Sequence, residues 1–424
     1  MHLILRFTYI AFSYLLTPLI LLHLFYKGFG NRAYWRRNGE RFGFFGAPPP
    51  PGGIWLHAVS VGEVQAAAPL VRALLKSHPG RPLVLTTTTP TGSDRVRALF
   101  GDSVVHCYAP FDLAWPVKRF FDWSRPAIAI ILETELWPNL YHECGQRKVP
   151  LVLASARLSA RSIGRYRLLV SLFKETLSHG IVIAAQTAPD AERFLSLGAN
   201  PARTRVTGNI KFDFVLPAGV REQGVELRKK YAGARPAWVA ASTHAGEEEQ
   251  VLAAHRAIQK KIPDALLILV PRHPERFDGI AALLERQGFD FVRRSSGRAG
   301  TPATEVVLGD TMGELVAFYA AVDIAFVGGS LVEVGGHNLL EPAALHLPIV
   351  TGPNNYNAQD ITDLFVDSGV ARVIRDADEL AAAVRNLMSD PAAARALGDR
   401  AGKLTESNRG ALQRLLQLLE PLLR

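Results

Sequence analysis

The chain has 424 residues, of which 48% are hydrophobic and 21% are charged, a balance that is typical of folded domains and excludes a wholly disordered chain. At roughly 150 residues per domain, this length predicts two or three domains. Cys107 and Cys144 are too few for a disulfide scaffold and lie in no Cys-x-x-Cys setting, so we expect a reducing compartment and no zinc site. The net charge of +9 favours an anionic partner. The charge alone does not decide whether this partner is nucleic acid, an anionic membrane or a phosphorylated substrate.

Residues 7–26 contain no Asp, Glu, Lys or Arg, and a helix of this length reaches about 30 Å, the thickness of the hydrocarbon layer of a membrane. A signal peptide is disfavoured because basic residues follow the run in place of a small-residue cleavage site. A buried core helix agrees with Pro18 and with several polar residues in the run. We favour a membrane anchor, which either spans the bilayer or lies in it.

Basic residues follow this apolar run, with only Glu40 opposing them. The positive-inside rule places them, and everything after about residue 27, on the cytoplasmic side of the membrane. They are also suited to holding anionic lipid headgroups. These residues are Lys27, Arg32, Arg36, Arg37 and Arg41.

From Ile54 onward, short apolar runs alternate with helical patterns, which predicts parallel strands that are buried on both faces and joined by crossover helices. The first series of expected strands lies within residues 54–60, 82–89, 127–135, 150–156, 181–187 and 205–210. The second series lies within residues 238–243, 265–273, 289–295, 304–310, 324–330 and 347–352.

The sequence therefore predicts the α/β class, with two doubly wound Rossmann-like domains that face each other across a cleft and an N-terminal membrane helix. Residues rich in charge, Gly and Pro separate the two series and indicate an interdomain linker. We expect a membrane anchor and basic segment at 1–46, a first domain at 47–216, the linker at 217–236, a second domain at 237–405 and a C-terminal helix at 406–424.

Acidic and basic side chains follow several expected strands of the first domain. Glu63 lies where the first strand leads into a helix, a position that suits a general base but equally suits a residue that complements the helix dipole. Glu133 and Glu135 end another strand and would share one face of it, which favours a role in a site. Lys211 follows the short strand of the GNIKFD segment and points toward the same edge.

An arginine-rich segment covers residues 155–167. Arginines spaced by four share one side of a helix and suit bidentate contacts with phosphate, although a solvated helix face explains them as well. The arginines are Arg157, Arg161, Arg165 and Arg167.

Three loops of the second domain have residues suited to anions. Ser242, Thr243 and Glu247 fit a helix N-cap, and the same geometry offers N–H groups to a phosphate. Arg272 directly follows a buried strand. Packing does not explain an arginine at this position, so we expect it to contact an anion or nucleotide. A glycine-rich loop precedes residues 338–341. No G-x-G-x-x-G or P-loop motif occurs, which disfavours dinucleotide oxidoreductases and P-loop NTPases.

Taken together, these motifs resemble the 3-deoxy-D-manno-octulosonic acid (Kdo) transferases of lipopolysaccharide assembly. The resemblance covers nearly the whole chain in the expected order. It is carried by the segments SVGEV, TTTTPTG, ETELWPN, SARLS, GNIKFD, STHAGEEE, PRHPERF, GDTMGEL and GGHNLLEPAA.

The resemblance implies an inverting glycosyltransferase of the GT-B fold that moves Kdo from CMP-Kdo to the lipid A precursor (lipid IVA) at the cytoplasmic face of the inner membrane. It implies no metal and no cofactor beyond the donor substrate. The implied partners are CMP-Kdo, the lipid A precursor and anionic inner-membrane lipids. Nucleic acid is not expected, because the basic residues are not interleaved with aromatic residues on a recognisable module.

The resemblance also implies roles for individual residues. Glu63 would be the general base, and Glu133 and Lys211 would support the transition state. The residues expected around CMP are Pro271, Arg272, Met312, Gly313, Glu314, Asn338, Leu339, Leu340 and Glu341. Two alternatives stay open at this point: a nucleotide-sugar epimerase of the same two-Rossmann architecture, and a non-enzymatic membrane-tethered binding protein.

Overall fold

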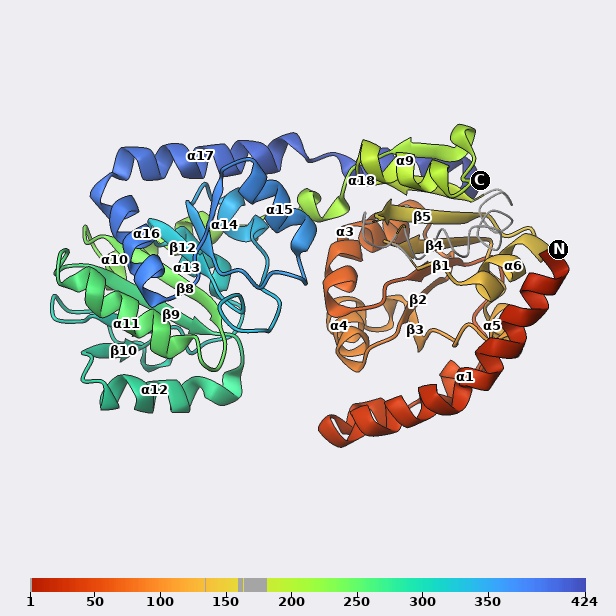
Figure 1. The fold of residues 1–424 in the computed structure, drawn as a ribbon, viewed down its shortest axis with the longest axis horizontal. Helices are drawn as coiled ribbons and strands as arrows, with labels where there is room; N and C mark the ends of the chain where they lie inside the picture. The colour runs from red at the N-terminus through yellow and green to blue at the C-terminus, as the bar shows by residue number, and fades with distance from the viewer. Residues whose placement is uncertain (1, 134, 159–162, 164–180) are drawn as a thin grey trace. The chain divides into compact units, whose positions relative to one another are not determined.

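The computed structural model describes residues 2–133, 135–158, 163 and 181–424 of the chain. The chain divides into two compact units. The first comprises Met1–Asp213 together with Asn408–Arg424, and the second comprises Phe214–Ser407 (Figure 1). Each unit is built around a parallel sheet with helices on both faces.

The sheet of the first unit has, within the described residues, seven strands in the order β3-β2-β1-β4-β5-β6-β7. Successive side chains of a strand point to opposite faces, and both faces are buried here. Ile54 and Leu56 of β1 join one apolar cluster, whereas Trp55 between them joins another. The strands are β1 (Ile54–His57), β2 (Leu83–Thr87), β3 (Val105–Tyr108), β4 (Ile128–Leu132), β5 (Leu151–Ala156), β6 (Val182–Ala185) and β7 (Thr204–Val206).

Helices of the first unit connect these strands or flank the sheet. The α-helices are α1 (His2–Gly30), α2 (Asn38–Arg41), α3 (Val61–Ser77), α4 (Pro90–Phe100), α5 (Ala114–Ser124), α6 (Pro138–Gln146), α9 (Ala188–Ser196) and α18 (Ala411–Leu423). Short 3₁₀ helices occur at η1 (Arg32–Trp35), η2 (Gly101–Ser103), η3 (Pro201–Arg203) and η4 (Ile210–Asp213).

The sheet of the second unit has the order β10-β11-β9-β8-β12-β13-β14, again parallel throughout. Its strands are β8 (Ala237–Thr243), β9 (Leu266–Pro271), β10 (Phe291–Arg293), β11 (Val306–Leu308), β12 (Ile324–Val327), β13 (Ile349–Thr351) and β14 (Ala371–Val373). Its helices are α10 (Val220–Tyr231), α11 (Glu248–Gln259), η5 (Pro274–Arg276), α12 (Phe277–Arg286), η6 (Arg294–Ser296), α13 (Leu315–Ala320), α14 (Leu340–Ala344), α15 (Gln359–Asp367), α16 (Ala377–Ser389) and α17 (Pro391–Ser407).

The structure differs from the expected domain boundaries at two places. The expected linker at 217–236 contains helix α10, which belongs to the second unit because Gly224 packs directly against Ala320 of α13 and leaves no room there for a Cβ. The expected C-terminal helix returns to the first unit as α18, where Leu415 and Leu419 are fully buried in the same apolar cluster as β1. Strands β3 and β14 were not predicted, and both have exposed residues that weaken the apolar pattern.

The N-terminal segment forms the expected long helix α1, and residues Arg6–Gly30 are long and apolar enough to cross a membrane. Only 6% of its most apolar window is buried, so the core-helix interpretation is wrong. Two of the basic residues expected at lipid headgroups are used internally. Arg41 is buried and donates to the carbonyl oxygen of Thr88 at 2.7 Å, and Arg37 donates to the Glu40 carboxylate at 2.7 Å and to the carbonyl oxygen of His106.

Asp213 holds the returning helix α18 on the first unit. Its carboxylate accepts hydrogen bonds from the backbone N–H groups of Gly410 at 2.7 Å and Leu412 at 2.6 Å, which are among the unpaired donors at the start of α18. A negative charge at this position also complements the helix dipole. Asp213 ends η4, so the same contact fixes the segment that carries Lys211.

We expect Asp213→Ala to lower the free energy of unfolding by about 1–2 kcal/mol, because two N–H donors lose a charged cap. The loss would appear as a lower Tm and as faster proteolysis near residue 410. Glu420→Ala is the matched control, since Glu420 lies on the same helix and pairs only with exposed Arg424 among the contacts in this part of the structure. Equal Tm values for the two variants would contradict this role of Asp213.

Candidate active site

Glu63 lies in the first turn of α3, immediately beyond the carboxyl end of β1. One carboxylate oxygen accepts from the backbone N–H of Val59 at 2.8 Å, and the other accepts from the Ser60 hydroxyl at a longer 3.3 Å. Burial raises the pKa of Glu63 to about 8, and the negative charge of Glu133 contributes to the same shift. Glu63 therefore stabilises the helix start and is also a carboxyl group that titrates near neutral pH.

Glu133 and Lys211 form an ion pair beside Glu63. The distance from Lys211 Nζ to Glu133 Oε1 is 2.8 Å, and both side chains are partly exposed. A small cavity of about 10 Å³, roughly the space of one water molecule, is lined by all three residues and by Ser155 and Asn209. The three side chains expected to act together are thus placed together.

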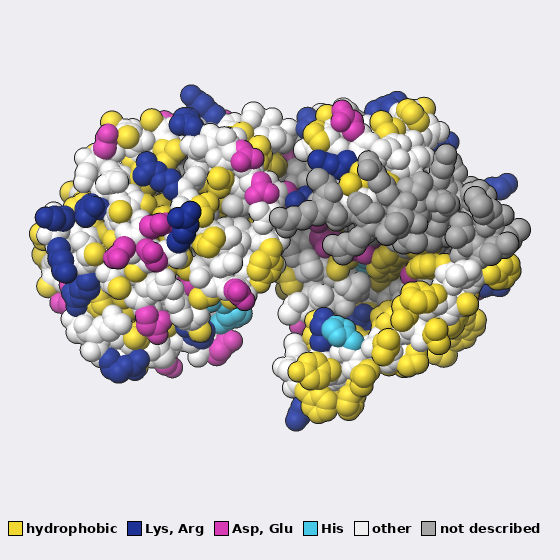
Figure 2. Space-filling model, in the orientation of Figure 1, with side chains coloured by type: hydrophobic (Ala, Val, Ile, Leu, Met, Phe, Trp, Pro, Cys, Tyr) yellow, Lys and Arg dark blue, Asp and Glu magenta, His cyan; other side chains and the backbone are white. Residues whose placement is uncertain are grey.

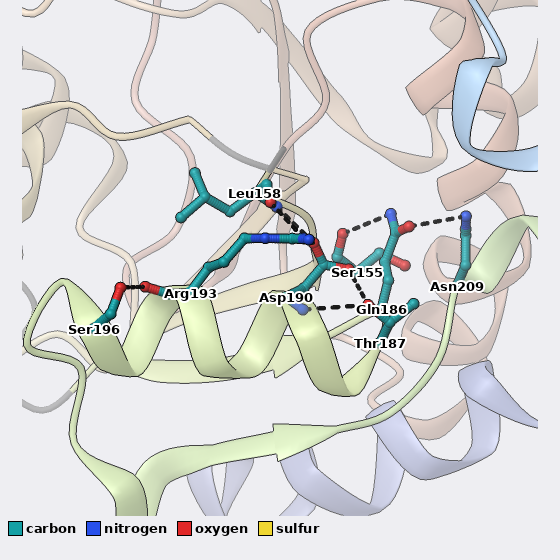
Figure 3. A network of polar contacts seen from close by, with 8 residues as sticks. All are labelled: Ser155, Leu158, Gln186, Thr187, Asp190, Arg193, Ser196 and Asn209. Carbon is teal, nitrogen blue, oxygen red and sulfur yellow. Dashed lines mark hydrogen bonds and ion pairs between the residues drawn. The ribbon is translucent and has the colours of Figure 1, made fainter. Parts of the chain in front are cut away.

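Lys211 is positioned by a network that joins the ends of β5 and β6 to η4 (Figure 3). The Ser155 hydroxyl accepts from the backbone N–H of Ile210 at 3.0 Å. Gln186 donates to the carbonyl oxygen of Ser155 at 3.0 Å and accepts from Asn209 at 3.2 Å. The Asn209 side chain in turn accepts from the backbone N–H of Lys211 at 3.0 Å. Ser155, Gln186 and Asn209 were not predicted as site residues.

A second part of this network holds the chain after β5 (Figure 3). Thr187 caps α9 by accepting from the N–H of Asp190 at 3.2 Å. Asp190 accepts from the N–H of Leu158 at 3.0 Å, and Arg193 donates to the carbonyl oxygen of Leu158 at 2.9 Å. Arg157 directly precedes this anchored residue. The other members of the predicted arginine surface, Arg161, Arg165 and Arg167, lie outside the described residues.

Glu133 and Glu135 were expected to share one face of a continuing strand, but β4 ends at Leu132, before both residues. Glu133 has a left-handed backbone conformation, with φ of 56°, and this conformation ends β4 instead of continuing it. The Glu135 carboxylate turns to accept from the indole N–H of Trp137 at 2.7 Å. Burial raises the pKa of Glu135, the Trp137 hydrogen bond opposes this rise, and the negative charge of Glu133 adds to it. Glu135 in turn contributes to the raised pKa of Glu63, so it lies near the site.

In the second unit, Arg272 follows β9 and its side chain is exposed. Glu341 lies in the first turn of α14, where Asn338 donates to its carboxylate at 3.3 Å. Burial raises the pKa of Glu341, while the Asn338 hydrogen bond and the positive charge of Arg272 oppose that rise. Arg272 and Glu341, which were both expected around the nucleotide, therefore act on each other electrostatically.

The other residues expected around the nucleotide differ in what they can offer. Glu314 is already paired with Arg294, at 2.7 Å, and this pairing outweighs burial and lowers the pKa of Glu314. Met312 is 60% exposed and Gly313 has a φ of 86°, so this turn presents a side chain and bare backbone to solvent. The side chains of Pro271, Leu339 and Leu340 are buried, which leaves only their backbone for a ligand.

Glu247 is fully buried and serves neither as a simple helix cap nor as a ligand group. Its carboxylate accepts from the backbone N–H groups of His244 at 3.0 Å, Gly329 at 2.7 Å, Ser330 at 2.9 Å and Leu331 at 2.9 Å. The N–H groups that a glycine-rich loop offers to phosphate are thus occupied by an internal anion. We conclude that residues 328–331 shape the loop and do not cradle a phosphate.

The same loop orders two histidines that sequence reasoning missed. The rings of His244 and His337 are stacked with centroids 5.1 Å apart, and their Nε2 atoms are 2.9 Å apart, close enough for one ring to donate a hydrogen bond to the other. Burial lowers the pKa of His337 to about 3, and the neighbouring His244 and Arg272 add to this effect. Within the described ranges, no group of three or more His, Cys, Asp or Glu side chains is placed to hold a metal ion.

We expect Glu247→Gln to release the loop at residues 328–331, because an amide places an NH₂ group against backbone donors and removes the charge. Hydrogen bonds to charged groups contribute about 1.5–3 kcal/mol each, so the free energy of unfolding should fall by about 3 kcal/mol or more. Amide hydrogen exchange at Gly329, Ser330 and Leu331 would report the change directly. Exposed Glu249→Gln is the control, and wild-type protection of the loop in Glu247→Gln would contradict the assignment.

Two family models match the chain. Residues 36–214 match the model described as 3-deoxy-D-manno-octulosonic-acid transferase (kdotransferase), and residues 234–404 match glycosyl transferases group 1. These ranges correspond closely to the two sheet-containing units. They support the expected GT-B fold of two parallel-sheet α/β domains, which the chain has.

Individual proteins agree with the family models. The chain is 45% identical to the 3-deoxy-D-manno-octulosonic acid transferase of Haemophilus influenzae, with 99% of each chain covered, and 37% identical to that of Bordetella pertussis, with 96% of each covered. Among solved structures, a UDP-GlcNAc 2-epimerase from Neisseria meningitidis is similar with a TM-score of 0.57 at 13% identity, covering 87% of this chain and all of that one, which shows the fold alone. The relatives confirm the predicted glycosyltransferase over the epimerase and the non-enzymatic alternatives. The chain belongs to the 3-deoxy-D-manno-octulosonic acid transferase family.

Proposed function

We propose that this enzyme transfers Kdo from CMP-Kdo to the lipid A precursor, with Glu63 as the general base. The observation that carries this proposal is the Glu63 carboxyl group, buried at the carboxyl end of β1 beside the Glu133–Lys211 ion pair. Ligands of open α/β sheets bind at this edge. The pKa of about 8 also suits a base, since a carboxylate that holds a proton more strongly is better at removing one.

The proposed reaction is a single displacement. The acceptor hydroxyl oxygen attacks the anomeric carbon of Kdo while Glu63 takes the hydroxyl proton, and the bond from that carbon to the phosphate oxygen breaks. CMP leaves with the bonding electron pair, and one attack from one face inverts the anomeric centre. Most of the rate enhancement comes from holding the two substrates in place, and the base adds about 10²–10⁴-fold.

The second unit is proposed to hold CMP-Kdo. Exposed Arg272 would offset the charge of the leaving phosphate, and Glu341 would accept hydrogen bonds from the ribose hydroxyls. The turn with Met312, Gly313 and Glu314 would contribute backbone contacts. Because the leaving group is a phosphate monoester and a weak base, stabilising its charge matters more than protonating it, and we propose no metal requirement.

The membrane attachment is part of the same proposal. The apolar helix α1 and the exposed cations Lys27, Arg32 and Arg36 would hold the enzyme at the cytoplasmic face of the inner membrane. A lipid acceptor and anionic lipids would then be presented to the first unit, which carries both α1 and Glu63.

We expect Glu63→Gln to reduce Kdo transfer by about 10²–10⁴-fold while CMP binding is unchanged, because the amide keeps the shape of the side chain but cannot take a proton. Mass spectrometry of the lipid A precursor after incubation with CMP-Kdo measures the product and the number of Kdo residues added. Exposed Glu249→Gln is the control and should retain wild-type activity. Substantial transfer by Glu63→Gln would exclude Glu63 as the base.

A further inference from the structure

We propose that α1 does not cross the bilayer but lies in the plane of its cytoplasmic surface, with one side held along the first unit and an apolar side in the membrane. The partner is the boundary between headgroups and acyl chains of an anionic bilayer. This inference rests on the membrane attachment proposed above and specifies its geometry.

One side of α1 is covered by the protein from Arg6, where the described side chains of the helix begin, to Gly28. The residues with reduced exposure recur every three or four positions, which at 100° per residue places them on a single face. A helix that spans a bilayer alone would show no such face. The covered residues are Arg6, Tyr9, Ile10, Ser13, Leu16, Thr17, Ile20, Leu24 and Gly28.

The first half of α1 is joined to the loop that precedes α5 and to the first turn of α5. The Tyr9 hydroxyl donates to the Asp112 carboxylate at 2.8 Å, and the Tyr14 hydroxyl accepts from the backbone N–H of Trp115 at 3.1 Å. The same Asp112 carboxylate accepts from the backbone N–H groups of Asn139 at 3.1 Å and Leu140 at 2.8 Å. This half of the helix is therefore tied to groups that order the edge of the first sheet.

The second half of α1 is held by η1. The Trp35 indole donates to the carbonyl oxygen of Phe25 at 3.1 Å, stacks on the Phe25 ring and fills the space that a side chain at Gly28 would need. Helix α2 follows and is anchored in turn, since the backbone N–H of Phe111 donates to the carbonyl oxygen of buried Arg41 at 2.8 Å. Both ends of α1 are thus connected to the body of the unit.

These contacts are incompatible with a helix that crosses the membrane. If α1 kept them while spanning, the Asp112 carboxylate and the exposed charges Lys118, Arg119 and Asp122 of α5 would be drawn to membrane depth. Each charge at the bilayer centre costs about 2.5–3.5 kcal/mol or more. If α1 left the unit, Asp112 and Trp35 would lose the hydrogen bonds that they make with α1.

The uncovered side of α1 is apolar and suited to a membrane surface. Figure 2 shows hydrophobic side chains gathered along this helix. Phe44 and Trp115 extend the face, with the Arg119 guanidinium over both rings. Exposed Lys27 lies in the last turn of α1, and exposed Arg32 and Arg36 follow the helix. Apolar residues that enter the interface beside cations that face headgroups are typical of in-plane helices. The exposed apolar residues are Phe7, Phe12, Tyr14, Leu15, Leu19, Leu21, Leu22, Phe25, Tyr26 and Phe29.

The sidedness of the N-terminus tests this proposal in the full-length protein. His2→Cys and, as a reference in the second unit, Glu249→Cys would each be reacted with a membrane-impermeant maleimide in sealed, inverted inner-membrane vesicles, in which the cytoplasmic face is outward. The native Cys107 and Cys144 are buried, with 4% and 2% exposure, and do not compete. For an in-plane helix, both introduced cysteines should react equally before and after detergent. Labelling of His2→Cys only after detergent would show a spanning helix and overturn the proposal.

Depth along the helix gives an independent readout. A fluorophore on Phe7→Cys, Leu15→Cys or Leu22→Cys, all on the apolar side, should be quenched by spin-labelled lipids at the same shallow depth, and Ser13→Cys on the covered side should be quenched least. A probe at Leu15 that lies far deeper than one at Phe7 would contradict the in-plane geometry. Absence of the protein from the vesicles would overturn the membrane attachment and this inference together, whereas the Kdo-transfer assay tests the catalytic proposal separately.

Discussion

Carboxylates that accept hydrogen bonds from backbone N–H groups hold distant chain segments together within each unit of this enzyme. Glu247 joins two loops of the second unit through four such groups, Asp213 fixes the returning helix α18 through two, and Asp112 joins α6 through two more while it binds Tyr9 of α1. Each of these carboxylates organises chain segments that are distant in sequence. The full burial of Glu247 and the partial burial of Asp112 and Asp213 are tolerated because these hydrogen bonds replace those to water.

Glu63 departs from this arrangement, and the departure explains its chemistry. Its carboxylate accepts one hydrogen bond from the backbone N–H of Val59 and a longer one from the Ser60 hydroxyl, and the negative charge of Glu133 lies nearby. The charged form is therefore poorly compensated, and the carboxyl group holds its proton up to a pH of about 8. Asp112 accepts hydrogen bonds from more donors, and its burial raises its pKa only to about 6. The same side-chain chemistry thus serves as a structural link in one place and as a candidate base in another.

Sequence reasoning reached the two parallel sheets and the grouping of Glu63, Glu133 and Lys211, because the carboxyl ends of parallel strands meet at one edge. It missed the contacts of Glu247 with the loop at 329–331. A glutamate near a helix start is usually interpreted as a cap, and these partners are about eighty residues away in sequence. It assigned Arg37 and Arg41 to lipids because charge in sequence does not reveal burial. It extended the strand through Glu133 and Glu135, since the left-handed conformation of Glu133 that ends β4 has no signature in these residue types.

The pH dependence of Kdo transfer tests the central claim that an under-compensated Glu63 is the base. A base must be unprotonated, so kcat/KM should rise with pH through the pKa of about 8 and level off above it. Glu133→Gln removes a negative charge that raises this pKa and removes the ion pair between residue 133 and Lys211, so the rise should move to lower pH. An unshifted pH profile in Glu133→Gln, or a profile without this rise in the wild-type enzyme, would contradict the account.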